Sequence, residues 1–408
     1  MSFSKPESLG IVACPGAEDF SSEVISHLRK IYGKRFEKMT AVLAKRYSVD
    51  KEEAIKRINF QRELTAGLVD YNQPIDTYKS TKFKVPVKFY RFANGEVKSE
   101  ILKSVRGMDI YIISDPENHE PLVIGGEDRR LSVNDHMMYL FVTIEAAIHA
   151  GARTVTIVVP SFPYSRQHKR RGREALTASW FCRICEYMNV SRIITLDIHS
   201  KEIQNSFSHI SMENLHASYQ IIKKLITLID LKTEDLVVVS PDTGAVDRNK
   251  FYANSLHKPL ALLYKERDYS RVSTHANNTN ISATRLLGDV KDKTVFMADD
   301  MLGTGGTLYK AMRYLKEMGA KKIICAVSLP LFSGEAIDHF EEAYKDGLFY
   351  RIIGTNAVHH PKELLNREWF VSVNISKLFA QIISRLHHGR SLSPLLDNSN
   401  IIQRLLKQ

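Results

Sequence analysis

Two adjacent carboxylates, Asp299 and Asp300, stand at the end of an apolar run, directly before a loop of glycine and threonine. Two like charges at contact distance repel each other unless a cation or a hydrogen-bond donor lies between them. A helical pattern begins after the loop, and the loop lacks the GxxxxGK[ST] spacing of a P-loop. The residue types therefore predict a ligand at this point of the chain.

The loop that follows the two acids has the residue types of an anion site. Its glycines allow successive backbone N–H groups to point at one phosphate, and its threonines add hydroxyl groups and can cap the helix. The two carboxylates suit a vicinal diol, which offers two O–H donors. A ligand that carries both groups is a ribose 5-phosphate. The predicted contacts with it are Asp299, Asp300, Gly303, Thr304, Gly305, Gly306 and Thr307.

Along the rest of the chain, segments with strand patterns alternate with segments with helix patterns. Strand patterns end near residues 115, 160, 198, 240 and 300, and several run into loops that open helices. Alternation of this kind predicts parallel sheets covered by helices. A faint duplication pairs VRGMDIYIISD, from Val105, with VKDKTVFMADD, from Val290. Either two related α/β domains or a shared βα grammar without common ancestry explains the likeness.

Composition narrows the class of partner. The chain has 408 residues, a formal net charge of +11 and 44% hydrophobic residues, as in an ordinary globular protein of two or three domains. The basic residues are spread along the chain, with one dense run at 168–173. This distribution favours polyanionic small molecules over nucleic acid. No apolar stretch has the length of a membrane span, and the few cysteines and the lack of a signal peptide predict a cytoplasmic protein.

The four cysteines include one CxxC pair, Cys182 and Cys185. Such a pair can be a redox site or half of a zinc site. The surrounding ALTASWFCRICEYM is typical of a helix, and no second pair lies at zinc spacing. We therefore expect both thiols to be ordinary core residues.

The stretch VFMADDMLGTGGT closely resembles the ribose-phosphate motif of type I phosphoribosyltransferases and of the ribose-phosphate pyrophosphokinase family. The family has Asp where Gly303 stands. Five further stretches resemble the pyrophosphokinases in the family's order: FANGEV, PYSRQ, LDIHSKEIQNSF, VVSPDTGAVDRNK and LLYKERDYSR. Asn94 replaces a family Asp and Ala245 a family Gly. The resemblance runs from about Phe92 to Leu396, and it implies that the chain belongs to this family.

The resemblance implies roles for residues at matching positions. It implies Asn94, Gly95, Glu96, Arg166 and Gln167 as ATP contacts, where the turn at Asn94 would reach ATP of a neighbouring subunit. It implies His199 and Asp242 as the magnesium sites, and Lys265 and Arg267 as the catalytic cations. Lone histidines and loop charges are common on other grounds, so these roles depend on the order of the motifs.

The implied fold is two tandem phosphoribosyltransferase-like α/β domains, each a mainly parallel sheet flanked by helices. We expect a first domain over 1–213 with an insertion at about 38–78, a second over 214–385, and a tail over 386–408 that packs back on the first domain.

The implied activity is that of a ribose-phosphate diphosphokinase, which transfers the pyrophosphoryl group of ATP to the C1 hydroxyl of ribose 5-phosphate, with Mg²⁺ as cofactor. Self-association as a dimer or hexamer is expected. Two alternatives stay open: a non-catalytic regulatory subunit of such a synthetase, and a phosphoribosyltransferase, which would need only the ribose loop.

Overall fold

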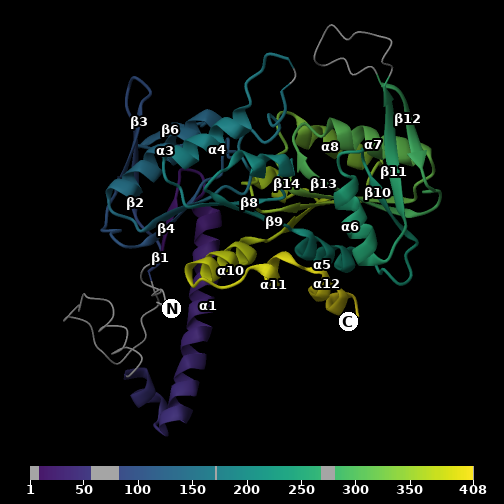
Figure 1. Ribbon diagram of the computed structural model, residues 1–408. Coiled ribbons are helices and arrows are strands. Elements are labelled where there is room, and N and C mark those ends of the chain that lie inside the picture. Colours follow the sequence, from purple (N-terminus) through teal and green to yellow (C-terminus); the bar gives the residue numbers. More distant parts are fainter. Residues whose placement is uncertain (1–8, 57–81, 171, 268–280, 408) are drawn as a thin grey trace.

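A computed structural model of the chain describes residues 9–56, 82–170, 172–267 and 281–407, and for 265–267 and 281–283 it describes the backbone. Two sheets lie side by side, with helices on both faces (Figure 1). Strands such as DIYII, at 109–113, and LVVVS, at 236–240, are buried throughout. Uninterrupted apolar strands are what a parallel sheet requires when helices cover both of its faces.

The first sheet has five parallel strands. In spatial order they are β1 (Leu9–Ala13), β4 (Asp109–Ile113), β7 (Thr154–Val158), β8 (Arg192–Leu196) and β9 (Ser211–Leu215). Two antiparallel hairpins accompany it: β2 (Val87–Arg91) with β3 (Val97–Ile101), and β5 (Leu122–Ile124) with β6 (Glu127–Arg129).

Among the residues that the structure describes, the second sheet has seven strands, six of them parallel. In spatial order they are β12 (Ile281–Leu287), β11 (Leu260–Arg267), β10 (Leu236–Ser240), β13 (Thr294–Leu302), β14 (Lys322–Pro330), β15 (Arg351–Thr355) and β16 (Phe370–Val373). Only β12 runs antiparallel, as the edge strand of a hairpin with β11.

The helices form the outer layers. They are α1 (Glu18–Tyr47), α3 (Val133–His149), α4 (Thr177–Tyr187), the 3₁₀ helix η2 (Lys201–Ser206), α5 (Ser218–Leu228), α6 (Val246–Leu256), α7 (Gly306–Glu317), α8 (Ala336–Lys345), α9 (Lys362–Leu365), α10 (Ser376–His387), α11 (Ser393–Leu396) and α12 (Ser399–Leu406). In Figure 1, α3, α4, α7 and α8 lie above the sheets, and α1, α5, α10 and α12 lie below them.

The two sheets share one winding. The chain passes through β1, β4, β7, β8 and β9 in the same spatial order as through β10, β13, β14, β15 and β16. The duplicated stretches of the sequence occupy β4 and β13, the second strand of each series. The predicted fold class, two α/β units with mainly parallel sheets, is therefore confirmed.

The two units exchange helices on the lower face. α5 follows the last strand of the first sheet but packs on β15 and β16, and α10 follows the last strand of the second sheet but packs on α1. One apolar cluster therefore contains residues of both units, including Leu28, Ile222 and Phe379. The predicted boundary between 213 and 214 is wrong in detail, because β9 extends to Leu215.

The predicted insertion and tail differ from expectation where they are described. Residues 38–47 continue α1 as one helix that projects beyond the sheet, and 57–81 lie outside the described residues (Figure 1). The tail does not simply return to the first unit. His388 bonds the hydroxyl of Tyr32 there, but α12 packs on α5 and α6, where the Gln403 amide donates to the carbonyl of Ser255.

The CxxC pair is structural, as the sequence predicted. Cys182 and Cys185 are fully buried in α4, and burial raises the pKa of both thiols, to about 12 for Cys182. Such thiols are poor nucleophiles and poor metal ligands.

Candidate active site

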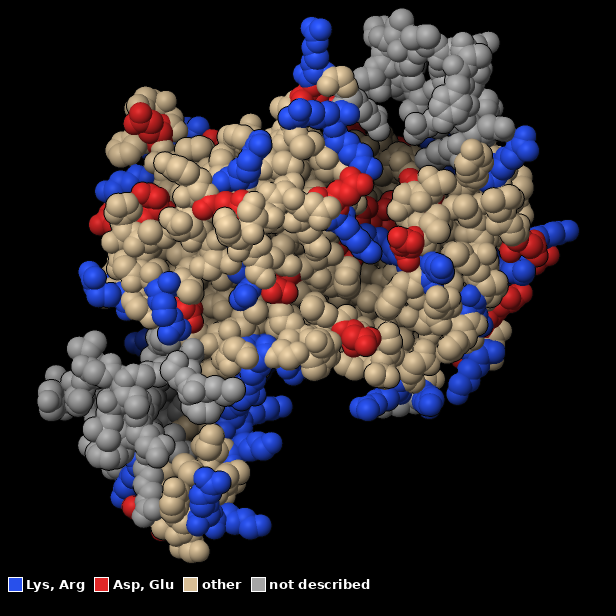
Figure 2. All heavy atoms as spheres, in the orientation of Figure 1, with Lys and Arg blue, Asp and Glu red and all other residues tan. Residues whose placement is uncertain are grey.

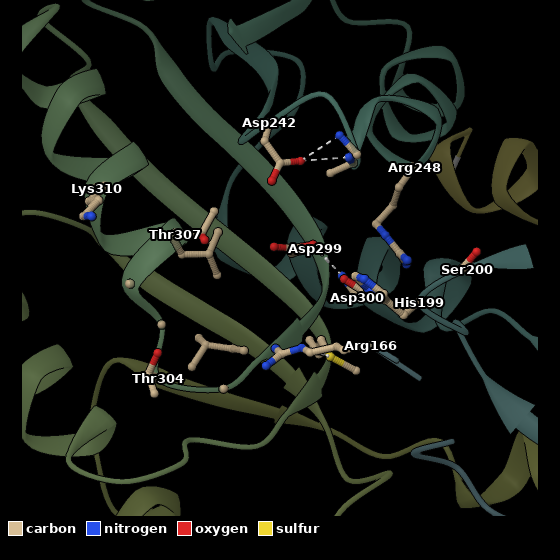
Figure 3. A pocket seen from close by; sticks show the side chains of 18 of the residues that line it. Arg166, His199, Ser200, Asp242, Arg248, Asp299, Asp300, Thr304, Thr307 and Lys310 are labelled. Carbon is tan, nitrogen blue, oxygen red and sulfur yellow. Dashed lines mark hydrogen bonds and ion pairs between the residues drawn. The ribbon is translucent and has the colours of Figure 1, made fainter. Parts of the chain in front are cut away.

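A cavity of about 840 Å³ lies between the carboxyl ends of the two sheets (Figure 3). The first unit contributes loops that follow β7 and β8, and the second contributes loops that follow β10 and β13. In open α/β sheets ligands bind at this edge, where loops can approach them without disturbing the core. The residues that line the cavity are Arg166, His168, Lys169, His199, Ser200, Asp242, Gly244, Ala245, Arg248, Asp299 to Leu308 and Lys310.

The glycine loop joins β13 to α7 and leaves its amides open to the cavity. Gly305 has φ +75°, which favours glycine, and a Cβ there would stand 2.7 Å from Cζ of Phe340. Among the described contacts, no side chain caps the first turn of α7. Unpaired N–H groups at a helix start are the arrangement that favours an anion.

The two adjacent acids have opposite surroundings. Asp300 is buried, and its Oδ2 lies 2.7 Å from Nδ1 of His199. Burial alone would raise the pKa of Asp300, but the bonds from His199 and Asp299 and the charge of Arg248 lower it to about 2. Burial and the charge of Asp300 raise the pKa of Asp299 well above its usual value. The two acids thus have pKa values shifted in opposite directions, and Arg248 and His199 supply the cation and the hydrogen bond that adjacent carboxylates require.

Arg248 is the cation that the sequence analysis did not single out. It comes from the first turn of α6, its Nη1 lies 3.1 Å from Oδ1 of Asp197, and its side chain is 22% exposed. Its charge also acts on Asp299 and Asp300. Asp197, at the end of β8, links both units because it also accepts from His216 and from Ser328. An Arg directly after a strand–turn signal, GAVDR, was the available signal.

Asp242 lies in the turn after β10. Its Oδ1 accepts from the backbone N–H of Gly244 (2.9 Å) and of Ala245 (3.1 Å), which leaves Oδ2 for a ligand (Figure 3). Ala245 has φ −92°, an ordinary value for alanine, so the replacement of the family's Gly does not disturb the turn.

His199 and Asp242 fit a largely hydrated Mg²⁺ rather than an enclosed one. Nδ1 of His199 is taken by Asp300, and one oxygen of Asp242 is taken by backbone amides. Within the described ranges, no group of three or more His, Cys, Asp and Glu side chains could hold a metal. Magnesium commonly keeps several waters and takes its other ligands from substrate phosphates, which suits this sparse set.

The predicted ATP contacts do not all meet. Arg166 lines the cavity, whereas Gln167 next to it is exposed and does not. Asn94, Gly95 and Glu96 form the exposed turn between β2 and β3, where Asn94 Oδ1 accepts from the N–H of Glu96. They do not line the cavity, and their hairpin lies at the far end of the first unit (Figure 1).

The predicted catalytic cations, Lys265 and Arg267, belong to the end of β11. Lys265 pairs with Thr284 of β12, and the register shifts between Glu266 and Arg267. Because Ser240, the last residue of β10, pairs with Leu262, both cations stand beyond the carboxyl end of β10. That is the edge at which Asp242 lies, but the side chains of Lys265 and Arg267 are outside the described part of the structure.

Comparisons with known proteins agree with this architecture. Residues 72–188 match the family model "N-terminal domain of ribose phosphate pyrophosphokinase", and 211–357 match "Phosphoribosyl transferase domain". The fold is similar to that of a phosphoribosylpyrophosphate synthetase from Mycobacterium smegmatis, with a TM-score of 0.67 and 24% identity, over 93% of this chain and 99% of that one. The fold is thus that of a tandem phosphoribosyltransferase-like enzyme.

Curated relatives define the family. The chain is 33% identical to ribose-phosphate pyrophosphokinase A of Dictyostelium discoideum, over 76% of this chain and 89% of that protein. It is also 33% identical to ribose-phosphate pyrophosphokinase 4 of Saccharomyces cerevisiae, over 79% and 91%. The chain belongs to the ribose-phosphate pyrophosphokinase family, and it is an enzyme of that class.

Proposed function

We propose that this enzyme transfers the pyrophosphoryl group of ATP to the C1 hydroxyl of ribose 5-phosphate, giving 5-phosphoribosyl 1-pyrophosphate and AMP. The observation that carries the proposal is the pairing of two half-sites across one cavity. The second unit contributes the paired acids and the glycine loop, and the first contributes Arg166 and His199. A reaction between two anionic substrates needs such a composite site.

In this proposal the second unit holds the sugar phosphate. The amides from Gly303 to Thr307 and the hydroxyls of the threonines receive the phosphate. Asp299 and Asp300 accept from the two ring hydroxyls. Since Asp299 retains its proton to a higher pH than a free Asp, it can also donate a hydrogen bond until the diol arrives.

The first unit and the β10 turn hold the nucleotide. Arg166 neutralises phosphate charge, and Mg²⁺ near His199 and Asp242 would screen the triphosphate when bound. Lys265 and Arg267 stabilise the charge that develops on the transferred group, because such reactions are catalysed mainly by positioning and charge neutralisation. Asn94, Gly95 and Glu96 are exposed and lie far from the cavity of their own chain. This supports the proposal that they contact ATP bound in a neighbouring subunit. Gln167 is proposed to contact ATP in its own subunit.

A regulatory subunit without activity is the second candidate, since Asn94 and Gly303 depart from the family pattern. A phosphoribosyltransferase is less consistent with a cavity that both units line. Nucleic acid is not a proposed partner, because the basic residues are spread along the chain. Over the two sheets, on the face seen in Figure 2, Lys and Arg stand among Asp and Glu. No described helix is long and apolar enough to cross a membrane. A cytoplasmic location and self-association stay predictions.

The test mixes the full-length protein with ATP, Mg²⁺ and ribose 5-phosphate and follows AMP by chromatography. We expect AMP only when the sugar phosphate is present. Lys265→Ala should lower its rate by about 10³-fold, as for other cations that stabilise transferred phosphoryl groups. Lys250→Ala, an exposed lysine of α6, is the matched control and should keep the rate. Saturable binding of ribose 5-phosphate without AMP formation would favour the regulatory subunit.

A further inference from the structure

Arg166 reaches from the first unit into the glycine loop of the second. Its Nε donates to Sδ of Met301 at 3.0 Å. Its Nη1 and Nη2 each lie 3.3 Å from the point at which a Cβ on Gly303 would stand. A side chain at position 303 would therefore press on the guanidinium group of Arg166. Figure 3 shows Arg166 beside the glycine loop.

The backbone does not explain the glycine at 303. Gly305, two residues later, has a left-handed φ and a ring of Phe340 against it, so it must be glycine. Gly303 has no such φ, and the three atoms nearest to its Cβ would all belong to the guanidinium group of Arg166. The feature that any side chain at 303 would disturb is therefore the position of Arg166.

The terminal nitrogens of Arg166 are available to an anion. Met301 takes Nε, and no ion pair joins Arg166 to an acid among the residues that the structure describes. The side chain is exposed to the cavity, and the amides of the phosphate loop begin at the residue it covers. A guanidinium group presents its N–H donors in a fixed fork, which matches phosphate oxygens.

We propose that Arg166 binds the phosphate of the sugar substrate as well as the nucleotide, and that Gly303 acts as a positioning residue that makes room for it. This inference rests on the proposed function, since it assigns a second ligand to a cation of the same site. One arginine then contacts both anionic substrates. A side chain larger than glycine at position 303 would displace it from the sugar phosphate.

The experiment measures binding of ribose 5-phosphate by titration calorimetry, without nucleotide, in a double-mutant cycle. Gly303→Asn adds bulk without charge, and it should weaken binding about tenfold by displacing the guanidinium group, since a hydrogen bond to a charged group is lost. Arg166→Ala should weaken it by a similar factor. In the Arg166→Ala background, Gly303→Asn should change the affinity less than twofold, because the group it displaces is absent.

Gly303→Ala provides a second, smaller perturbation if the Asn variant does not fold, with an expected weakening of about threefold that also vanishes in the Arg166→Ala background. Gly33→Ala is the control, because Gly33 in α1 has open space around it among the described residues and no left-handed φ. In steady-state kinetics of the Gly303 variants, the KM for the sugar phosphate should rise more than the KM for ATP.

Equal weakening by Gly303→Asn in both backgrounds would overturn the inference and leave the proposed function intact. An unaltered affinity in Arg166→Ala would do the same. If the wild-type protein binds no ribose 5-phosphate at all, the proposed function fails first, and the inference fails with it.

Discussion

The ends of β4 and β13 occupy equivalent positions in the two units, but the acids that stand there have different surroundings. Both follow the second strand of the same winding, and both keep an acid at the matching position, Asp115 and Asp300. Asp115 is 6% exposed, and its Oδ2 accepts from the backbone N–H of His359 in the other unit at 2.6 Å. Asp300 borders the cavity and is balanced by His199 and Arg248.

The connections that follow the two strands differ as well. After β13 a short loop leads directly into α7, so the helix start is open to a ligand. After β4 the chain passes through the β5–β6 hairpin before α3, and the α3 start is closed by a capping box between Ser132 and Asp135. In the first unit the strand-end acid therefore contacts the second unit, and the residues that line the cavity come from the loops after β7 and β8.

The largest expected effect comes from removing the cation beside Asp300. Arg248→Met should lower the free energy of unfolding by about 3 kcal/mol, because it leaves buried carboxylates uncompensated. It should also abolish saturable binding of ribose 5-phosphate. Urea unfolding and calorimetry measure the two effects. An unchanged unfolding midpoint would show that Asp197 and the acid pair do not depend on Arg248.

The tight loop after β13 gives the next effect. Gly305→Ala should cost about 2 kcal/mol, because alanine is strained at φ +75° and its Cβ would press on Phe340. Gly306→Ala is the matched control for stability, since a Cβ there meets open space among the described residues and φ is ordinary. Thermal unfolding of both variants decides the matter, and equal midpoints would contradict the strain argument.

Asp115 gives a pH-dependent effect. Burial raises its pKa from 3.8 to about 7, so the folded state binds the proton more tightly than the unfolded state. Wild-type stability contributed by this group is therefore present at low pH and is lost as the pH rises from about 4 to about 7. Relative to the wild type, Asp115→Asn should gain about 1 to 3 kcal/mol of stability as the pH is raised from 5 to 8. The cost of one lost acceptor is the same at both pH values and cancels from this difference.

Urea unfolding of both proteins at the two pH values isolates Asp115, because every other titratable group is the same in the two proteins. A difference between the two proteins that does not change with pH would show that Asp115 keeps an ordinary pKa, and that the contact with His359 tolerates its charge.

The smallest effect is expected at the start of β4. Asp109 accepts from Arg153, Thr154 and the buried His387 of α10, whereas its counterpart in the second unit is the neutral Thr294. Arg153 is 48% exposed. Arg153→Ala should therefore cost no more than about 1 kcal/mol, or about 3 °C in the unfolding midpoint. A much larger loss would show that this ion pair contributes more to stability than a half-exposed pair is expected to.

Much of the fold was predictable from local pattern. Apolar runs and the glycine loop predicted β13 and a helix after it, and the apolar side chains on the inner face of that helix, Leu308, Ala311, Met312 and Leu315, are buried. Met318 is 42% exposed, because the helix ends at Glu317 and Gly319 turns the chain away. The α5 and α10 exchange was not predictable, since an amphipathic helix does not specify which sheet its apolar face will meet.

The candidate site divides in the same way. The ribose-phosphate residues, Arg166, His199 and Asp242 line one cavity, while the turn at Asn94 does not. Arg248 was missed because its partner Asp197 belongs to the other unit, at the end of β8 and 51 positions earlier in the chain.

The amino-acid sequence alone was enough to predict the alternation of strands and helices and the residue types of an anion site in the loop after β13. These depend on backbone dihedral angles, side-chain periodicity and glycine positions, which are local properties. The strand order, the place of Asp115 at an interface and of Asp300 at a cavity, and the compensation of the acids by Arg248 emerged from the folded chain. These outcomes depend on how two equivalent sheet edges face each other, because burial and opposing charge set the protonation of a carboxylate.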